Sequence, residues 1–160
     1  MPDMLIKLYE LPSLEHALTI AARQGVVVRR ALSLEKPSVL EWVQARFSGW
    51  TAEVEAAFCR LPVSCFLALR ERDLLGFACY DATCRNFFGP EAVLESERGR
   101  GLGRALLLAA LHAQRAQGYA YSIVGAAGPG EFYAKAVGAV WIEGSSPGVY
   151  AGMLRSGLKT

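Results

Sequence analysis

At 160 residues the chain is long enough for one domain with a sizeable hydrophobic core. Hydrophobic residues make up 52% of it and charged residues 20%, which is typical of a globular protein. The formal net charge of +2 and the absence of a basic run argue against nucleic acid, and we expect no signal peptide and no membrane span.

The first part of the chain predicts strands and helices in alternation. A strand is expected over residues 5–10, then a helix capped by Ser13, running to about Gln24 and ended by Gly25. The β-branched run VVVRRAL predicts a strand over residues 26–32. Two helices follow, at residues 37–47 and 51–60.

The pattern then changes to three consecutive strands, SCFLALRE, LLGFACYDA and NFFGPEAVLE, with Arg72-Asp73 as the tight connection between the first two. A long helix runs from near Gly101 to about Gln117, followed by the strand YSIVG and a helix over residues 130–137. AVWIE and GVYAGML predict two extended pieces at the end. This order predicts an α+β or mixed-sheet α/β domain of three layers.

Four cysteines fall in apolar stretches without a CxxC pair, and the chain has two histidines, so we expect no metal site. We interpret the cysteines as reduced thiols of a cytoplasmic protein, although the sequence leaves a disulfide open.

The segment RGRGLGR, residues 98–104, breaks the usual rules for the start of a helix. It has no Ser, Thr, Asp or Asn cap, and it places arginines where the helix dipole is already positive. Glycines there let free backbone N–H groups approach a ligand closely, so the segment predicts a phosphate-binding site. Its spacing does not fit the GxxxxGK[ST] loop, because no lysine follows. It does not fit the GxGxxG fingerprint either, because Arg104 and Leu106 stand where the last glycine would be.

The remaining pattern, Arg98, Gly101 and Gly103 after a strand and before an apolar helix, resembles motif A of the GCN5-related N-acetyltransferases (GNAT). PEAVLESERGRG is similar to the strand that leads into that motif, and EFYAKAVGAV is similar to the late FYxKxGF segment. The resemblance covers residues 26–142. It departs from the family at Glu95, where proline is common, in the GAAGPG loop, which lacks an asparagine, and in the first thirty residues, which match nothing in the family.

This resemblance implies a single domain over residues 1–160, with residues 1–25 as an extension of unclear match. The expected fold is a mixed, mostly antiparallel twisted sheet with helices on both faces. The expected activity is transfer of an acyl group, acetyl above all, from acetyl-CoA to a primary amine by direct attack in a ternary complex. The expected partner is a small-molecule or peptide amine, and a homodimer is left open. By the same resemblance, a backbone N–H of Val93 or Leu94 stabilises the oxyanion, and the loop holds the pyrophosphate with Arg98, Gly99, Arg100, Gly101, Leu102, Gly103 and Arg104.

Tyr133 is the expected proton donor to the departing thiolate, because the motif match places the family's usual acid there. Glu91 is our candidate for the general base, since it shares a strand face with Val93. A bulge at Gly89-Pro90 would change which way it faces. Asp81 and Glu131 are rivals, and deprotonation through water without a dedicated base is also open. His112 and Cys84 are interpreted as structural.

We expect the acceptor pocket to draw on Trp42, Phe47 and Trp50 and on the turn over residues 81–88, although such aromatic residues are more often core. Two alternatives to the enzyme remain. One is a non-catalytic acyl-CoA-binding sensor with a degenerate acceptor site. The other is a general phosphate- or nucleotide-binding protein.

Overall fold

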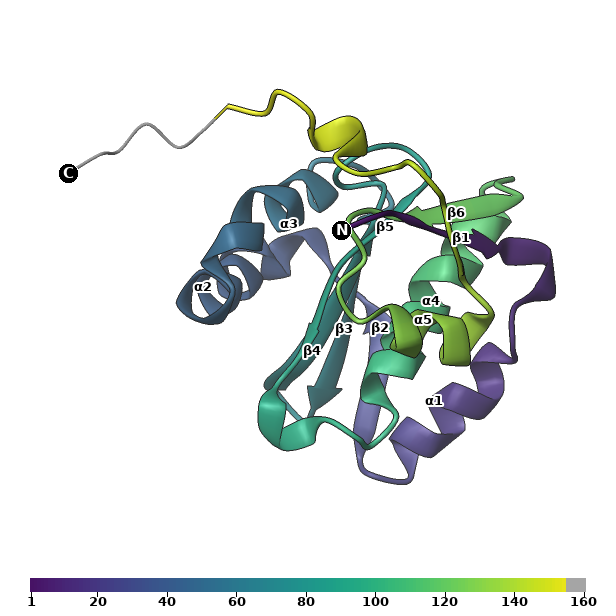
Figure 1. Ribbon diagram of the computed structural model, residues 1–160. Coiled ribbons are helices and arrows are strands. Elements are labelled where there is room, and N and C mark those ends of the chain that lie inside the picture. Colours follow the sequence, from purple (N-terminus) through teal and green to yellow (C-terminus); the bar gives the residue numbers. More distant parts are fainter. Residues whose placement is uncertain (155–160) are drawn as a thin grey trace.

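The computed structural model describes residues 1–154 and shows one seven-stranded sheet with helices on both faces (Figure 1). The strand order is β2-β3-β4-β5-β6-β1-β7, and every neighbouring pair is antiparallel except β5 and β6. The strands are β1 (Met4–Lys7), β2 (Val26–Arg30), β3 (Cys65–Arg70), β4 (Asp73–Tyr80), β5 (Phe87–Val93), β6 (Tyr121–Val124) and β7 (Val140–Trp141). The predicted fold class, a mixed and mostly antiparallel sheet between layers of helices, is confirmed.

The helices divide between the two faces of the sheet (Figure 1). They are α1 (Leu14–Ala22), α2 (Lys36–Arg46), α3 (Thr51–Ala57), α4 (Leu102–Ala116) and α5 (Gly130–Val137). On one face α4 packs with α1 and α5 in the larger core, and α2 and α3 form a second core with the opposite face. The run LLLAAL buries every side chain from Leu106 to Leu111, so α4 is central to the fold.

Most of the predicted elements are confirmed, with four corrections. The first strand ends at Lys7, and residues 8–10 form a 3₁₀ turn. The helix predicted over residues 51–60 is α3, and it ends at Ala57. The turn between β3 and β4 is Glu71-Arg72, with Glu71 at φ +54°. GVYAGML is not extended, because residues 148–150 form a 3₁₀ turn. Within residues 1–154, no helix has the length and apolar character needed to cross a bilayer.

The N-terminal segment is part of the sheet. Strand β1 lies between β6 and β7 and pairs antiparallel with both, through Met4 with Val124 on one side and Trp141 on the other. Ser13 caps α1 by accepting a hydrogen bond from the His16 N–H, as predicted, and Gly25 at φ +71° follows the helix.

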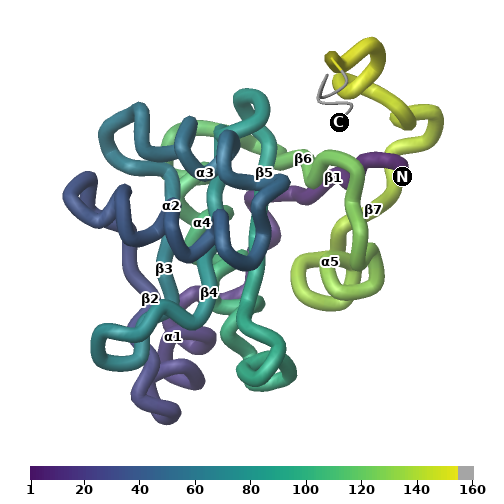
Figure 2. The backbone as a smooth tube through the Cα atoms, turned by 90° about the vertical axis from the view of Figure 1, so that its left-hand side faces the viewer, coloured from purple at the N-terminus to yellow at the C-terminus, as the bar shows by residue number. Residues whose placement is uncertain are grey.

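The sheet opens at β5. Ala78 pairs with Glu91 and Tyr80 with Phe88, so three steps along β5 oppose two along β4, and the extra residue makes a bulge at Gly89-Pro90. On its other side β5 pairs with β6 only at Phe87 and Phe88. Beyond Phe88 the two strands separate, and β6 leads toward the part of the molecule that carries β1, β7 and α5 (Figure 2).

Candidate active site

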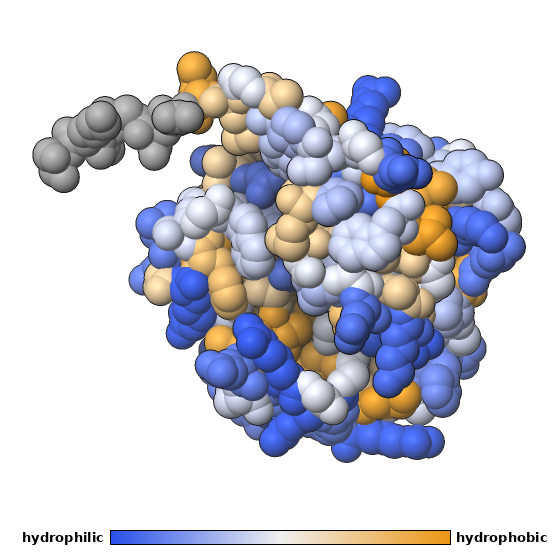
Figure 3. All heavy atoms as spheres, viewed as in Figure 1, coloured by the Kyte–Doolittle hydropathy of each residue, from blue (hydrophilic) through white to orange (hydrophobic). Residues whose placement is uncertain are grey.

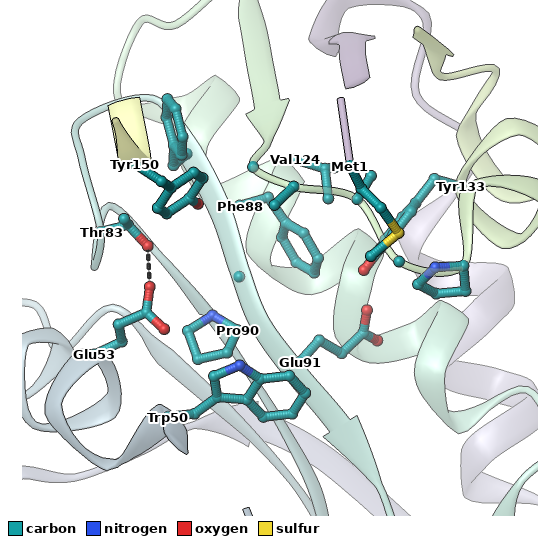
Figure 4. Close-up of a pocket in the computed structure, with 17 residues that line it drawn as sticks. Met1, Trp50, Glu53, Thr83, Phe88, Pro90, Glu91, Val124, Tyr133 and Tyr150 are labelled. Carbon is teal, nitrogen blue, oxygen red and sulfur yellow. Dashed lines mark hydrogen bonds between the residues drawn. The ribbon is translucent and has the colours of Figure 1, made fainter. Parts of the chain in front are cut away.

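A cavity of about 460 Å³ lies where β5 and β6 separate. Figure 3 shows apolar side chains at the centre of this face of the molecule, with hydrophilic side chains around them. The cavity walls come from the start of α3, from β5, from the loop after β6, from α5 and from the turn near the C-terminus (Figure 4). The residues labelled in that view are Met1, Trp50, Glu53, Thr83, Phe88, Pro90, Glu91, Val124, Tyr133 and Tyr150.

Glu91 lines this cavity from β5. The bulge lies before it in the strand, so Glu91 keeps the same face as Val93, toward α4. Part of the residue is exposed, but Oε1 is buried, and no group within residues 1–154 donates a hydrogen bond to it. Burial therefore raises the pKa of this carboxyl well above its ordinary value.

Tyr133 lines the cavity from the first turns of α5 and is 8% exposed. Its ring packs edge-on against Phe88 and Phe132, at centroid distances of 6.0 and 5.1 Å. Burial raises the pKa of the phenol, and the negative charge of Glu91 raises it further. Figure 4 shows Tyr133 and Glu91 at the same end of the cavity, on opposite walls. The structure therefore brings together the two predicted catalytic side chains.

The glycine-arginine segment forms the start of α4, as predicted. Gly101 is the N-cap at φ +84° and supplies no side chain, so nothing caps the first turn of this 15-residue helix. A Cβ added to Gly103 would lie 3.5 Å from Glu91 Oε1 and 3.6 Å from Phe132 Cζ. The helix start, with its free N–H groups, thus lies next to Glu91 on the cavity wall, and these residues fit a phosphate.

The arginines of this segment differ in their surroundings. The Arg98 Nε donates to the Val93 carbonyl at 3.3 Å. Arg100 pairs with Glu97 at 3.4 Å, and Arg70 also holds Glu97, through two hydrogen bonds of 2.8 and 3.0 Å. Arg104 is exposed on α4. Within this segment Arg104 is thus exposed, while Arg98 and Arg100 are held by the Val93 carbonyl and the Glu97 carboxylate.

The two predicted oxyanion donors are not equivalent. The Leu94 N–H donates to the Leu75 carbonyl in β4 at 2.8 Å, so it is already used. Because N–H groups alternate in direction along an antiparallel strand, the Val93 N–H points away from β4. It faces the side on which β6 has separated.

The rival acids lie elsewhere. The Asp81 carboxylate pairs with Arg60 at 2.9 Å and accepts from the Asn86 N–H at 2.8 Å, with its side chain 1% exposed. Glu131 is exposed on α5 and does not line the cavity. The His112 ring is within 2.9 Å of the Pro12 carbonyl, a structural contact. Cys84 lines an adjoining cavity of about 470 Å³ near the C-terminal turn, which shares Glu53, Thr83 and Tyr150 with the cavity of Glu91.

The predicted acceptor aromatics separate in the structure. Trp50 lines the cavity of about 460 Å³, which we call the main cavity because Glu91 and Tyr133 line it, and Phe47 stacks on Trp50 with centroids 5.5 Å apart. Trp42 instead lines a second cavity of about 620 Å³ near the β3–β4 turn. From the predicted turn over residues 81–88, Thr83, Phe87 and Phe88 reach the main cavity.

Sequence reasoning missed Glu53 and Tyr150. Glu53 lies on α3, and the sequence gives no sign that it is more than a solvent-exposed acid. In the structure it lines the cavity and accepts a hydrogen bond from the Thr83 hydroxyl. Tyr150 lies in the segment predicted to be extended. A Cβ at Gly125 would collide with the Tyr150 hydroxyl and the Phe87 ring, so the lack of a side chain at Gly125 was the one available signal of this close packing.

Comparison with known proteins shows which family and which solved structures this chain is similar to. The sequence matches the acetyltransferase (GNAT) family over residues 36–138, and no curated protein sequence matches it. Among solved structures, the glucosamine N-acetyltransferase region of a fungal multi-domain GH3 β-N-acetylglucosaminidase superposes with a TM-score of 0.72 at 14% identity, over 88% of this chain and 19% of that one. A GCN5-related N-acetyltransferase from Sphaerobacter thermophilus gives 0.66 at 18% identity, over 88% and 48%.

The chain thus spans about half or less of the length of these proteins. The family match covers most of the chain, including β5, the start of α4 and the site residues on α5. This protein belongs to the GNAT family of acetyltransferases.

Proposed function

We propose that this protein transfers an acetyl group from acetyl-CoA to a primary amine by direct attack. The observation that carries the proposal is a cavity lined by an unpaired strand edge and by the pair Glu91 and Tyr133, with an uncapped helix start packed against Glu91 at Gly103. Each feature answers a separate demand of acyl transfer to an amine.

The helix start is the proposed site for the cofactor. The N–H groups from Gly99 to Gly103 would hold the pyrophosphate, and Arg98, Arg100 and Arg104 add positive charge around it. Gly103 leaves room between α4 and β5, where a side chain would meet Glu91, Val93 and Phe132. Acetyl-CoA supplies the thioester whose C–S bond breaks as the C–N bond forms.

Val93 and Glu91 act on the two ends of the new bond. The Val93 N–H, unpaired on the open side of β5, donates to the carbonyl oxygen as that atom gains negative charge. Glu91 accepts the proton that the amine loses. Its raised pKa suits it to be a base near neutral pH, because burial makes the carboxylate more basic.

Tyr133 acts on the sulfur. Since its pKa is raised above the ordinary value of a tyrosine, the phenol keeps its proton throughout the physiological range. We expect it to donate a hydrogen bond to the sulfur as negative charge develops there.

Thermal unfolding with acetyl-CoA, CoA or ATP tests the binding part of the proposal. A ligand at a hundredfold excess over its Kd stabilises a protein by about 2.7 kcal/mol, a shift of several degrees. We expect a shift with acetyl-CoA and CoA but not with ATP. Equal shifts with CoA and ATP would indicate a nucleotide-binding protein, and no shift would contradict the proposal.

Substitution of Tyr133 tests the catalytic part. Tyr133→Phe should lower the rate of CoA thiol release by a factor of about 10² to 10⁴, the usual contribution of a positioned acid. The acetyl-CoA shift in unfolding temperature should remain, because the ring packing against Phe88 is kept. Cofactor binding without thiol release by the wild type, for any amine tried, would identify the protein as a sensor.

A further inference from the structure

The main cavity has two chemically different ends. Glu91 and Tyr133 form one end (Figure 4). Glu53, Thr83 and Tyr150 form the other, and Trp50 and Pro90 lie between them (Figure 4). The proposed chemistry uses only the first end.

From the second end we infer that the acceptor is an aliphatic amine with a second ammonium group, which Glu53, Trp50 and Tyr150 bind while the first amine reacts. This inference rests on the proposed function and adds the class of acceptor to it.

Glu53 is a carboxylate without a cationic partner in the described chain. One of its oxygens, Oε1, accepts from the Thr83 hydroxyl, which fixes the side chain and leaves Oε2 for a ligand (Figure 4). On the same helix Glu55 pairs with Lys36 at 3.0 Å, and no Lys or Arg within residues 1–154 forms an ion pair with Glu53. A carboxylate fixed in this way on a cavity wall attracts a cation.

The cavity wall contains no competing basic side chain. Among residues 1–154, its ionisable side chains are Glu53, Glu91, Tyr133 and Tyr150, without Lys, Arg or His. An acceptor with a carboxylate or phosphate would therefore meet only like charge at the second end. An acceptor with an ammonium group finds a partner there.

Aromatic rings add to this preference. Trp50 is 38% exposed, and its ring is held by stacking on Phe47 with an interplanar angle of 18°. Trp50 and Tyr150 lie on either side of Glu53 in Figure 4. Rings of this kind attract ammonium groups through their faces.

The two carboxyl groups have different environments, which assigns their tasks. Glu91 has a buried oxygen without a partner, so its end suits an amine that gives up its proton. Glu53 is only partly buried, and its end suits a group that keeps its charge. A flexible aliphatic chain between two amines would reach from one end to the other.

A matched series of acceptors tests the inference: pentylamine, 1,5-diaminopentane and 5-aminopentanoate, assayed by CoA thiol release. After correction for its two equivalent amines, the diamine should have kcat/KM about tenfold above that of pentylamine, which corresponds to about 1.4 kcal/mol. The aminopentanoate should be the poorest acceptor. Glu53→Gln should remove most of the diamine's advantage, chiefly through KM.

Glu55→Gln is the matched control, because Glu55 lies on the same helix, pairs with Lys36 and does not line the cavity. It should keep the full preference for the diamine. Trp50→Leu is a second variant and should reduce the preference in part. Equal kcat/KM for the monoamine and diamine, or a preference for the aminopentanoate, would overturn the inference while leaving the acetyltransferase proposal in place.

Equilibrium binding keeps the inference testable if no amine in the series is acetylated. The diamine and pentylamine are then titrated by calorimetry into wild-type protein saturated with CoA. Tighter binding of the diamine that Glu53→Gln removes would support the ammonium site at Glu53, and the missing acetylation would then count against the proposed function alone. Equal or absent binding of both amines would overturn it.

Discussion

Glu91 shows how a strand position can create a reactive group. Its Oε1 is buried without a partner, so the ionised form loses hydration that no hydrogen bond replaces. The charge therefore destabilises the folded protein whenever the group is ionised. Such an arrangement persists in proteins where the basicity of the group is used.

The pH dependence of stability follows from this shift. The pKa of Glu91 is raised in the folded protein, so its favourable contribution is complete below the unfolded pKa, about 4.3, and is lost as pH rises through the folded pKa. We expect Glu91→Gln to have a higher unfolding temperature than the wild type at pH 8, and the difference to shrink toward pH 4. Thermal unfolding at a series of pH values measures this.

The same variant separates a dedicated base from deprotonation through water. With Glu91 as the base, kcat/KM for the amine rises with pH through the raised pKa, and Glu91→Gln lowers it by a factor of about 10² to 10⁴. A variant that turns over at the wild-type rate with an unchanged pH profile would show that water alone carries the proton. Asp81→Asn does not test the rival acid cleanly, because it also removes the carboxylate that pairs with Arg60 and so changes the structure there.

At the scale of elements, the start of α4 gives up local stability in order to expose its N–H groups. Gly101 has φ +84°, a conformation that other residues adopt at a cost of about 1–2 kcal/mol. Gly103 has no such constraint, and a Cβ there would make ordinary contacts at 3.5 to 3.8 Å. The two glycines therefore have different roles. Gly101 allows the backbone turn before the helix, and Gly103 leaves an open space next to Glu91.

Alanine at each glycine tests this distinction. Gly101→Ala should destabilise the free protein by about 1 kcal/mol or more. Gly103→Ala should leave the stability of the free protein unchanged or raise it by up to about 1 kcal/mol, because alanine favours helix. It should nevertheless reduce the shift in unfolding temperature that acetyl-CoA produces. A full acetyl-CoA shift in Gly103→Ala would show that the cofactor does not need this space.

For the whole molecule, the position of β1 makes the N-terminus a structural part of the sheet. It pairs with β6 and β7 on its two sides, and its Ile6 side chain is completely buried. Without β1 the two neighbouring strands would lose their connection. The loop after β6, which lines the cavity, would lose its support as well, because Asp3 Oδ1 accepts from the Ala126 N–H at 2.8 Å.

Truncation of a single side chain measures this contribution. Ile6→Ala should lower the free energy of unfolding by about 2–5 kcal/mol, the range for a buried aliphatic residue. Lys7→Ala, on the exposed side of the same strand, should change it by no more than about 0.5 kcal/mol. Urea unfolding of both variants provides the comparison, and a neutral Ile6→Ala would show that β1 is dispensable.

The sequence by itself determined the elements whose signals are local. The Ser13 cap, the apolar run of α4 and the glycine-arginine break before it depend on residues within a few positions of one another, so each could be predicted with its neighbours. The spacing of Arg98, Gly101 and Gly103 also identified the family, because the backbone of one short loop defines that motif.

Only the tertiary structure decided what depends on distant pairing. Strand β1 takes its place between β6 and β7 through hydrogen bonds to residues more than a hundred positions away, and no local pattern encodes such a register. Likewise, Glu53 and Tyr150 become one end of a cavity only when α3 and the C-terminal turn meet across β5. The basicity of Glu91 has the same origin, since it comes from burial of its oxygen where β5 packs against the start of α4 at Gly103, and not from its neighbours in the chain.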